Sequence, residues 1–369
     1  MNDKIIYKPL NQLREAWRSN TPSARLQALR KQTPYLRGHM LGEGGLLGVK
    51  TFDLITIPYP SSMGFSGAAL SPAPYLLFTN RVNVVQFLDH DGDKKTLLFN
   101  PTDYEASART PFFARLSQRY GDFLSNKVMA KRHNTVLGAL QSLGISPEEV
   151  DYIAYDHQHT QDLRGVLGTE TQAGWFPKAK LLIQRIEWEM TQDLHPLQSD
   201  WFIAEGTRGI SSDRVVLLDG DVSLGKGVAL ISTPGHTYGN QTLAVCLSGT
   251  MIFTFSENGV AADSYAPLRS KIPGITTHAR NTGQEVILNG NTREATLDQY
   301  NSMIIEKILS GPSPVDPDVC NHIPSSELTA SPLAPMLSPT FFHGPLMFGE
   351  VSSSKNGVVS HKPEVITAP

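Results

Sequence analysis

The segment that decides the fold of this chain is Asp156-His157-Gln158-His159-Thr160-Gln161-Asp162-Leu163-Arg164-Gly165. It follows the apolar run from Val150 to Tyr155, which is typical of a buried strand that runs out into a loop. His157 and His159 leave this strand end two residues apart, so a turn can aim both imidazoles at one point. Neutral imidazole is the commonest protein ligand for zinc and also binds iron, and Asp162 adds a carboxylate within the same turn. The segment therefore favours a metal site, although a chance histidine pair on a solvated loop would have the same local sequence.

A second segment with the same features is Ser232-Thr233-Pro234-Gly235-His236-Thr237-Tyr238-Gly239-Asn240. It follows the apolar run over residues 227–231, and its Pro-Gly pair forces a sharp turn that presents His236 at a strand end. A further strand-like run over residues 250–255 leads to Glu257. Three histidines at strand ends would form one facial set of metal ligands, and the Glu257 carboxylate could bind or bridge a metal.

Together, these segments resemble the motifs of the metallo-beta-lactamase superfamily, whose members include lactonases, glyoxalase II, arylsulfatase-like hydrolases and diiron oxidases. The first motif of that family is His-x-His-x-Asp-His-x-Gly-Gly, and Gly165 coincides with its last glycine. The second motif, Thr-Pro-Gly-His-Thr-x-Gly-His, is matched from Thr233 to Gly239. The resemblance covers about residues 45–345. It implies an α+β fold, a four-layer αβ/βα sandwich of two mixed β-sheets flanked by helices, with the metal site along one edge.

The chain departs from the family pattern at residues that serve its second metal position. Gln161-Asp162 stands where the family has Asp-His, Asn240 replaces the last histidine of the second motif, and Ser256-Glu257 replaces a Gly-Asp pair. The family also has a histidine after its last helix, which we expect over residues 296–309, and on that register this chain has Ser326. Two histidines could substitute for it, His322 and His343. We favour His343; otherwise the site lacks this ligand.

The resemblance implies a metal-dependent hydrolase. The expected metal ligands are His157, His159, Asp162, His236, Glu257 and His343. We expect one tightly bound zinc ion and a second that is weak or absent, with iron as the alternative metal. Asp162 or Glu257 would orient the attacking water or accept its proton, and Tyr238 could donate a hydrogen bond to a developing oxyanion. The leading function is hydrolysis of an ester or lactone. The alternatives are a mono- or diiron oxidoreductase and a degenerate member that binds a ligand without turnover.

Length and composition fit one catalytic domain with extensions. A chain of 369 residues that are 40% hydrophobic and 18% charged can bury a large core. We expect an N-terminal helical extension over residues 1–44, a catalytic domain over residues 45–349 and a loose C-terminal tail over residues 350–369. In the extension, apolar residues recur at helical spacing, which favours one or two short helices, and Pro22 and Pro34 interrupt any long amphipathic face. In the loop over residues 58–74, Tyr59, Met63 and Phe65 are candidate walls of a substrate pocket.

Charge and cysteine content limit which binding partners and which metal ligands the protein can have. A formal net charge of −3 without a Lys/Arg cluster argues against nucleic acid. Cys246 and Cys320 are too few for a disulfide framework or a thiolate zinc site, so a metal must be bound by nitrogen and oxygen. The N-terminus has no apolar leader and no apolar run reaches about 18 residues, so we expect no membrane partner and a cytoplasmic location. The expected partner is a small-molecule substrate, and a homodimer is compatible with the sequence.

Overall fold

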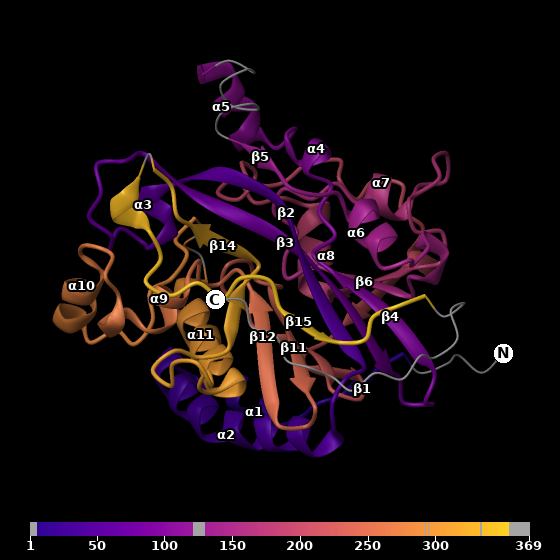
Figure 1. Cartoon of the computed structure of the whole chain (residues 1–369), viewed down its shortest axis with the longest axis horizontal. Coiled ribbons are helices and arrows are strands. Elements are labelled where there is room, and N and C mark those ends of the chain that lie inside the picture. The colour runs from indigo at the N-terminus through magenta and orange to yellow at the C-terminus, as the bar shows by residue number, and fades with distance from the viewer. Residues whose placement is uncertain (1–5, 121–129, 292, 294, 333, 354–369) are drawn as a thin grey trace.

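The computed structural model describes residues 6–120, 130–291, 293, 295–332 and 334–353, and two β-sheets packed face to face form its centre (Figure 1). The first sheet has the strand order β1-β9-β10-β11-β12-β13. Its strands are β1 (Lys8–Pro9), β9 (Val222–Gly225), β10 (Val228–Ser232), β11 (Gln241–Leu247), β12 (Met251–Ser256) and β13 (His322–Pro324). Neighbouring strands are antiparallel except for β12 and β13, which are parallel.

The second sheet has the strand order β15-β2-β3-β4-β6-β7-β8, with β5 beside β2 and β14 beside β3. Its strands are β2 (Gly48–Pro60), β3 (Tyr75–Leu88), β4 (Lys94–Phe99), β5 (Lys131–Arg132), β6 (Tyr152–Ala154), β7 (Lys180–Gln184), β8 (Val215–Leu218), β14 (Ser326–Thr329) and β15 (Met347–Gly349). Strands β4, β6, β7 and β8 are mutually parallel, and the other pairs are antiparallel. Both sheets are therefore mixed, as the sequence predicts.

Alternating apolar side chains explain why the sheets stack with helices outside them. In β10, Val228 and Leu230 belong to the core between the two sheets, whereas Ala229 and Ile231 belong to the core beneath the helices. Successive side chains of a strand point to opposite faces, so a strand that is apolar at every position is buried on both sides. The same alternation places Val85 of β3 in the central core and Val84 in the outer one.

Helices cover the outer face of each sheet and complete four layers. Helices α1 (Arg14–Trp17), α2 (Pro22–Glu43) and α11 (Thr296–Ser310) cover the first sheet, and α6 (Val136–Ser142) and α7 (Arg164–Leu167) cover the second (Figure 1). The remaining α-helices of the described residues are α3 (Ser61–Gly64), α4 (Tyr104–Ser107), α5 (Pro111–Tyr120), α8 (Arg185–Gln192), α9 (Ala262–Tyr265) and α10 (Ile275–Thr282). The predicted αβ/βα sandwich is confirmed.

The N-terminal segment differs from the expected short helices. Helix α2 is one helix of 22 residues that begins at Pro22 and continues through Pro34. Its buried positions include Leu29 and Leu36, which pack with Leu309 of α11, and this burial offsets the backbone hydrogen bond that Pro34 cannot donate. Strand β1 pairs with β9, so residues 6–44 form part of the sandwich itself.

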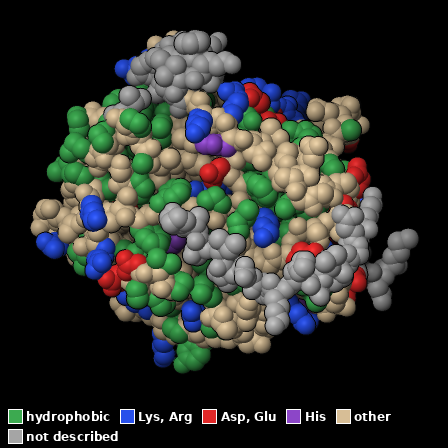
Figure 2. All heavy atoms as spheres, viewed as in Figure 1, with side chains coloured by type: hydrophobic (Ala, Val, Ile, Leu, Met, Phe, Trp, Pro, Cys, Tyr) green, Lys and Arg blue, Asp and Glu red, His purple; other side chains and the backbone are tan. Residues whose placement is uncertain are grey.

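The expected C-terminal tail begins in an ordered conformation. Val351 is buried, and the Ser352 N–H donates to Oε1 of Gln86 at 3.0 Å. Residues 354–369 lie outside the described residues. Within the described parts of the chain, no helix combines the length and the apolar character needed to cross a membrane. On the face drawn in Figure 2, acidic and basic side chains are interspersed.

Candidate metal centre and its pocket

Two strand ends bring His157, His159 and His236 together. His157 and His159 follow β6, and His236 follows β10. The ring centroids lie 4.7 Å (His157 and His159), 4.4 Å (His157 and His236) and 4.9 Å (His159 and His236) apart. One ring nitrogen from each histidine lies within 4.8 Å of the other two, and all three residues are buried. The sequence motifs therefore predicted a cluster that the fold assembles.

Burial and mutual proximity set the charge of these rings. Burial lowers the pKa of His159 well below its usual value, and the neighbouring His157 and His236 lower it further. Burial, followed by the charge of His157, lowers the pKa of His236 in the same way. For His157, burial lowers the pKa, but the adjacent Asp156 carboxylate more than offsets it and, with Glu257, raises the pKa to about 9. His159 and His236 are thus neutral near pH 7, the form in which imidazole binds metal.

The donor set fits a divalent metal ion. Nε2 of His159 is buried, and in the described part of the chain it has no hydrogen-bond partner. Nδ1 of His159 lies 3.3 Å from Nε2 of His236. Three imidazole nitrogens in one buried group match the three-histidine sets of catalytic zinc sites. Buried polar atoms without partners are rare in proteins, and a bound ion would satisfy them.

Glu257 lies beside the histidines, where the family resemblance places a bridging carboxylate. It follows β12, and its Oε2 accepts a hydrogen bond of 2.9 Å from the Ser326 hydroxyl. Ser326 also accepts a hydrogen bond of 3.2 Å from Nδ2 of Asn80. Burial raises the pKa of Glu257 to about 7, although His157 and the Ser326 hydroxyl act in the opposite direction. A carboxyl group with such a pKa can accept or release a proton near neutral pH.

The structure does not bring Asp162 to the histidine cluster. Its carboxylate accepts hydrogen bonds from Nε and Nη2 of Arg164, at 2.9 and 2.7 Å, and is also paired with Arg109. Burial raises the pKa of Asp162, but the hydrogen bonds and charges of the arginines outweigh this effect and lower it. Among the described residues, the groups of potential ligand atoms around His157 do not include Asp162. Asp162 lies away from the histidines because it pairs with Arg109, a residue distant in the sequence that follows helix α4.

His343 and Tyr238 also lie apart from the cluster. The His343 backbone N–H donates to Oε1 of Glu327 at 3.1 Å, and its ring packs against Phe341 with centroids 4.8 Å apart. It is absent from the potential metal groups of the described residues. Tyr238 is 41% exposed and does not line the pocket described below. His322, the other candidate, is buried in β13 with Nδ1 2.9 Å from the Thr254 hydroxyl.

Two carboxylates that the sequence motifs did not single out hold the histidine loops. Asp156 precedes His157, and its Oδ1 lies 2.8 Å from Nδ1 of that ring. Glu187, on α8, accepts hydrogen bonds from the Gln158 N–H at 2.7 Å and from the Thr237 hydroxyl at 2.7 Å. It therefore ties the first histidine segment to the second. Asp156 could have been found from its position beside the motif, whereas nothing local distinguishes Glu187 from other helical glutamates.

Gly239 of the second motif must be glycine because helix α8 approaches it closely. A Cβ atom added at Gly239 would lie 2.3 Å from Cβ of Glu187 and 2.5 Å from its backbone nitrogen. The Gly239 N–H donates to Oε2 of Glu187 at 3.2 Å. Only a residue without a side chain lets α8 approach this loop closely enough for that bond. The same contact fixes the turn that carries His236.

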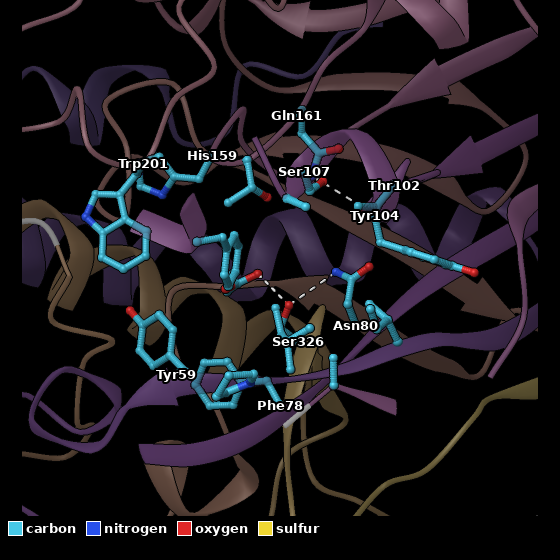
Figure 3. Close-up of a pocket in the computed structure, with 18 of the residues that line it drawn as sticks. Tyr59, Phe78, Asn80, Thr102, Tyr104, Ser107, His159, Gln161, Trp201 and Ser326 are labelled. Carbon is cyan, nitrogen blue, oxygen red and sulfur yellow. Dashed lines mark hydrogen bonds between the residues drawn. The ribbon is translucent and has the colours of Figure 1, made fainter. Parts of the chain in front are cut away.

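A pocket opens over the cluster. His157, His159, His236 and Glu257 are part of its lining. Figure 3 shows Tyr59 and Trp201 on one side of the pocket and Thr102 and Tyr104 on the opposite side. Tyr59 was expected there from the sequence, whereas Met63 and Phe65 are not among the lining residues.

The apolar wall of the pocket is built from distant segments. Tyr59 stacks on Phe78 with centroids 4.5 Å apart, and Trp201 stacks on Phe112 at 4.6 Å. Phe113 and Leu116 of α5 add to the lining. The pocket thus combines an apolar wall with convergent polar groups, which is the usual composition of a small-molecule site.

Relatives of this chain occur among curated proteins. An N-acyl homoserine lactonase from a Bacillus species is 28% identical over 127 residues, which are 34% of this chain and 45% of the relative. The N-acyl homoserine lactonase AttM of Azorhizobium caulinodans is 28% identical over 172 residues, 40% of this chain and 60% of the relative. The chain spans about half the length of the curated relatives it matches. No family model matches it.

Solved structures were also compared. The dizinc quorum-quenching lactonase AidC, solved with a product, has a TM-score of 0.49 at 14% identity and covers 88% of this chain and 98% of its own. A probable metal-dependent hydrolase from Staphylococcus aureus has a TM-score of 0.47 at 13% identity, with 61% and 78% covered. Both scores lie below 0.5. The protein is an αβ/βα sandwich with a candidate metal-binding site in the loops that follow its strands. These relatives, the two motifs and the sandwich agree with the resemblance to the metallo-beta-lactamase superfamily.

Proposed function

We propose that this protein is a metal-dependent hydrolase that opens the ester bond of a lactone. The observation that carries the proposal is the buried group of His157, His159 and His236 beneath a pocket with an apolar wall. A divalent ion held there would supply Lewis acidity, which polarises an ester carbonyl and makes water nucleophilic near neutral pH. We propose zinc, because three imidazoles in one group suit zinc well.

The side chains around the histidines have distinct roles in this proposal. Glu257 would accept the proton of the attacking water, because burial raises its pKa to about 7 and the Ser326 hydroxyl holds its Oε2. Asp156 orients the His157 ring through the bond to Nδ1, which leaves Nε2 for a metal. The backbone N–H of His236 donates to Oδ1 of Asn258 at 3.1 Å and fixes the third ligand.

The substrate class is proposed from the relatives and from the pocket. The curated relatives are N-acyl homoserine lactonases, whose substrates by name combine a lactone with an acyl chain. The aromatic and aliphatic wall formed by Tyr59, Phe78, Trp201, Phe113 and Leu116 offers an apolar surface for such a chain. The lactone carbonyl would then lie toward the histidines. We propose an N-acyl lactone, with the acyl group along this wall.

The test is metal content together with lactone hydrolysis. Protein purified without added metal is analysed by plasma mass spectrometry, and turnover of N-acyl homoserine lactones of several chain lengths is followed by proton release. The proposal expects zinc in the wild type and loss of most metal and activity in His157→Ala, His159→Ala and His236→Ala. His195→Ala removes an exposed histidine and serves as the matched control. Full metal content in all three cluster variants would rule out this site.

An oxidoreductase is the second candidate, and one observation favours it. The Asp156 and Glu257 carboxylates lie next to the histidines, and oxygen-rich donor sets suit iron. Iron as the metal of the purified protein, with no lactone hydrolysis, would support this reading. Zinc with lactone turnover would exclude it. A folded protein that takes up no metal would instead support the binding member without catalysis.

A further inference from the structure

A second group of potential ligands adjoins the three histidines. Asp156, His157 and Glu257 each offer a ligand atom, and these atoms lie within 4.8 Å of one another. Asp156 is only 3% exposed, and its Oδ1 is occupied by the His157 ring and by the His157 backbone N–H at 2.9 Å. Its Oδ2 is buried and has no hydrogen-bond partner among the described residues. A buried carboxylate oxygen without a hydrogen-bond partner destabilises the folded protein unless a hydrogen-bond donor or a cation reaches it.

The other buried acids near the site do have partners. Asp162 has the guanidinium groups of Arg109 and Arg164, and Glu187 accepts three hydrogen bonds. In the described parts of the chain, neither lysine nor arginine forms an ion pair with Asp156 or Glu257. Two neighbouring carboxylates, the buried Asp156 and the half-buried Glu257, repel each other, and the His157 ring reaches only Oδ1 of Asp156, so a cation at Oδ2 would compensate the rest of their charge.

We propose that Asp156 and Glu257 form a second cation position beside His157, without Asp162 and His343, which were expected from the sequence as further ligands. This inference rests on the proposed function, because the first ion of the three histidines is taken as given. Asp156 offers Oδ2, since Oδ1 stays on the His157 ring, and Glu257 offers a carboxylate oxygen. Two carboxylate oxygens form a hard donor set, which suits Mn²⁺ or Fe²⁺ and binds more weakly than the three imidazoles.

The experiment titrates the full-length protein with Mn²⁺ and Zn²⁺ after chelation, by calorimetry and by equilibrium dialysis with metal analysis. The wild type should bind one tight and one weaker ion. Asp156→Asn should weaken the second ion by about tenfold or more, and the first ion by less than the second, because Oδ1 still accepts from the His157 ring. This variant keeps Oδ1 as acceptor for the His157 ring and removes only the charge and the free oxygen. Glu257→Gln should have the same effect, and it provides an independent test if Asp156→Asn does not fold.

Asp162→Asn and His343→Ala are the controls, and both should retain two ions. A second ion that survives in Asp156→Asn and Glu257→Gln, or that disappears in Asp162→Asn or His343→Ala, overturns the assignment. A wild type that binds one ion and hydrolyses lactones also refutes it, while the proposed function stands. A wild type that binds none refutes both.

Discussion

The Glu187 carboxylate offers the sharpest test of how this fold builds its site. Glu187 is 1% exposed, and its two oxygens accept hydrogen bonds from the Gln158 N–H, the Thr237 hydroxyl and the Gly239 N–H. The first donor belongs to the first histidine segment and the other two to the second. Replacing Glu187 should therefore weaken the protein and separate the two segments.

The expected loss of stability on replacing Glu187 follows from these contacts. In Glu187→Gln, one oxygen can still accept from Gln158, but the new amide N–H₂ faces the Gly239 N–H. One buried backbone donor is left without an acceptor, which costs about 1–3 kcal/mol. Burial raises the pKa of Glu187 despite its hydrogen bonds, which shows that its buried charge is costly. The neutral glutamine avoids this cost, and this offsets part of the loss. We expect the free energy of unfolding to fall by about 1–2 kcal/mol in Glu187→Gln. In Glu187→Ala, which loses all three hydrogen bonds, it should fall by about 3–5 kcal/mol.

The assay is urea unfolding followed by circular dichroism, together with zinc affinity. Glu189→Gln is the matched control, since Glu189 is exposed on the same helix. The cluster should bind zinc more weakly in Glu187→Gln, because His157 and His236 are no longer held in register. If Glu187→Gln and Glu189→Gln unfold at the same urea concentration and bind zinc equally, Glu187 does not connect the two segments.

Three further predictions follow. Gly239→Ala should destabilise the protein by several kcal/mol, measured by the same unfolding assay, because its Cβ would lie 2.3 Å from that of Glu187; an unchanged midpoint would contradict the close approach. Burial raises the pKa of Asp221 to about 7, against about 3.9 when unfolded, so the native state binds this proton more tightly and the contribution of Asp221 to stability is lost as pH rises between these values. Relative to Asp221→Asn, the wild type should lose on the order of 2–4 kcal/mol between pH 4 and pH 8, and parallel pH profiles would refute this. Phe113→Ala should raise KM for long-chain acyl lactones more than for short ones with little change in kcat, and an equal effect on all chain lengths would remove Phe113 from the acyl wall.

The sequence by itself determined the layers of the fold and the three histidines. The run from Val228 to Ile231 is apolar at every position, so it had to be a strand buried on both faces, as β10 is. His157, His159 and His236 lie in the loops that follow such strands. Their position depends on where each strand ends, which is set by local residues such as the Pro-Gly turn before His236.

Only the tertiary structure decided which carboxylates accompany the histidines. Asp162 stands within the first motif, yet it pairs with Arg109, which is 53 residues away in the chain. Asp156 and Glu257 are 101 positions apart by number, and the two sheets bring their oxygens into one group. Glu187 reaches both histidine segments because Gly239 lets α8 approach. Local sequence fixes the ends of strands and the shapes of turns, whereas the partner of a buried charge is chosen by the packing of distant segments, where each carboxylate takes the donor or cation that compensates it.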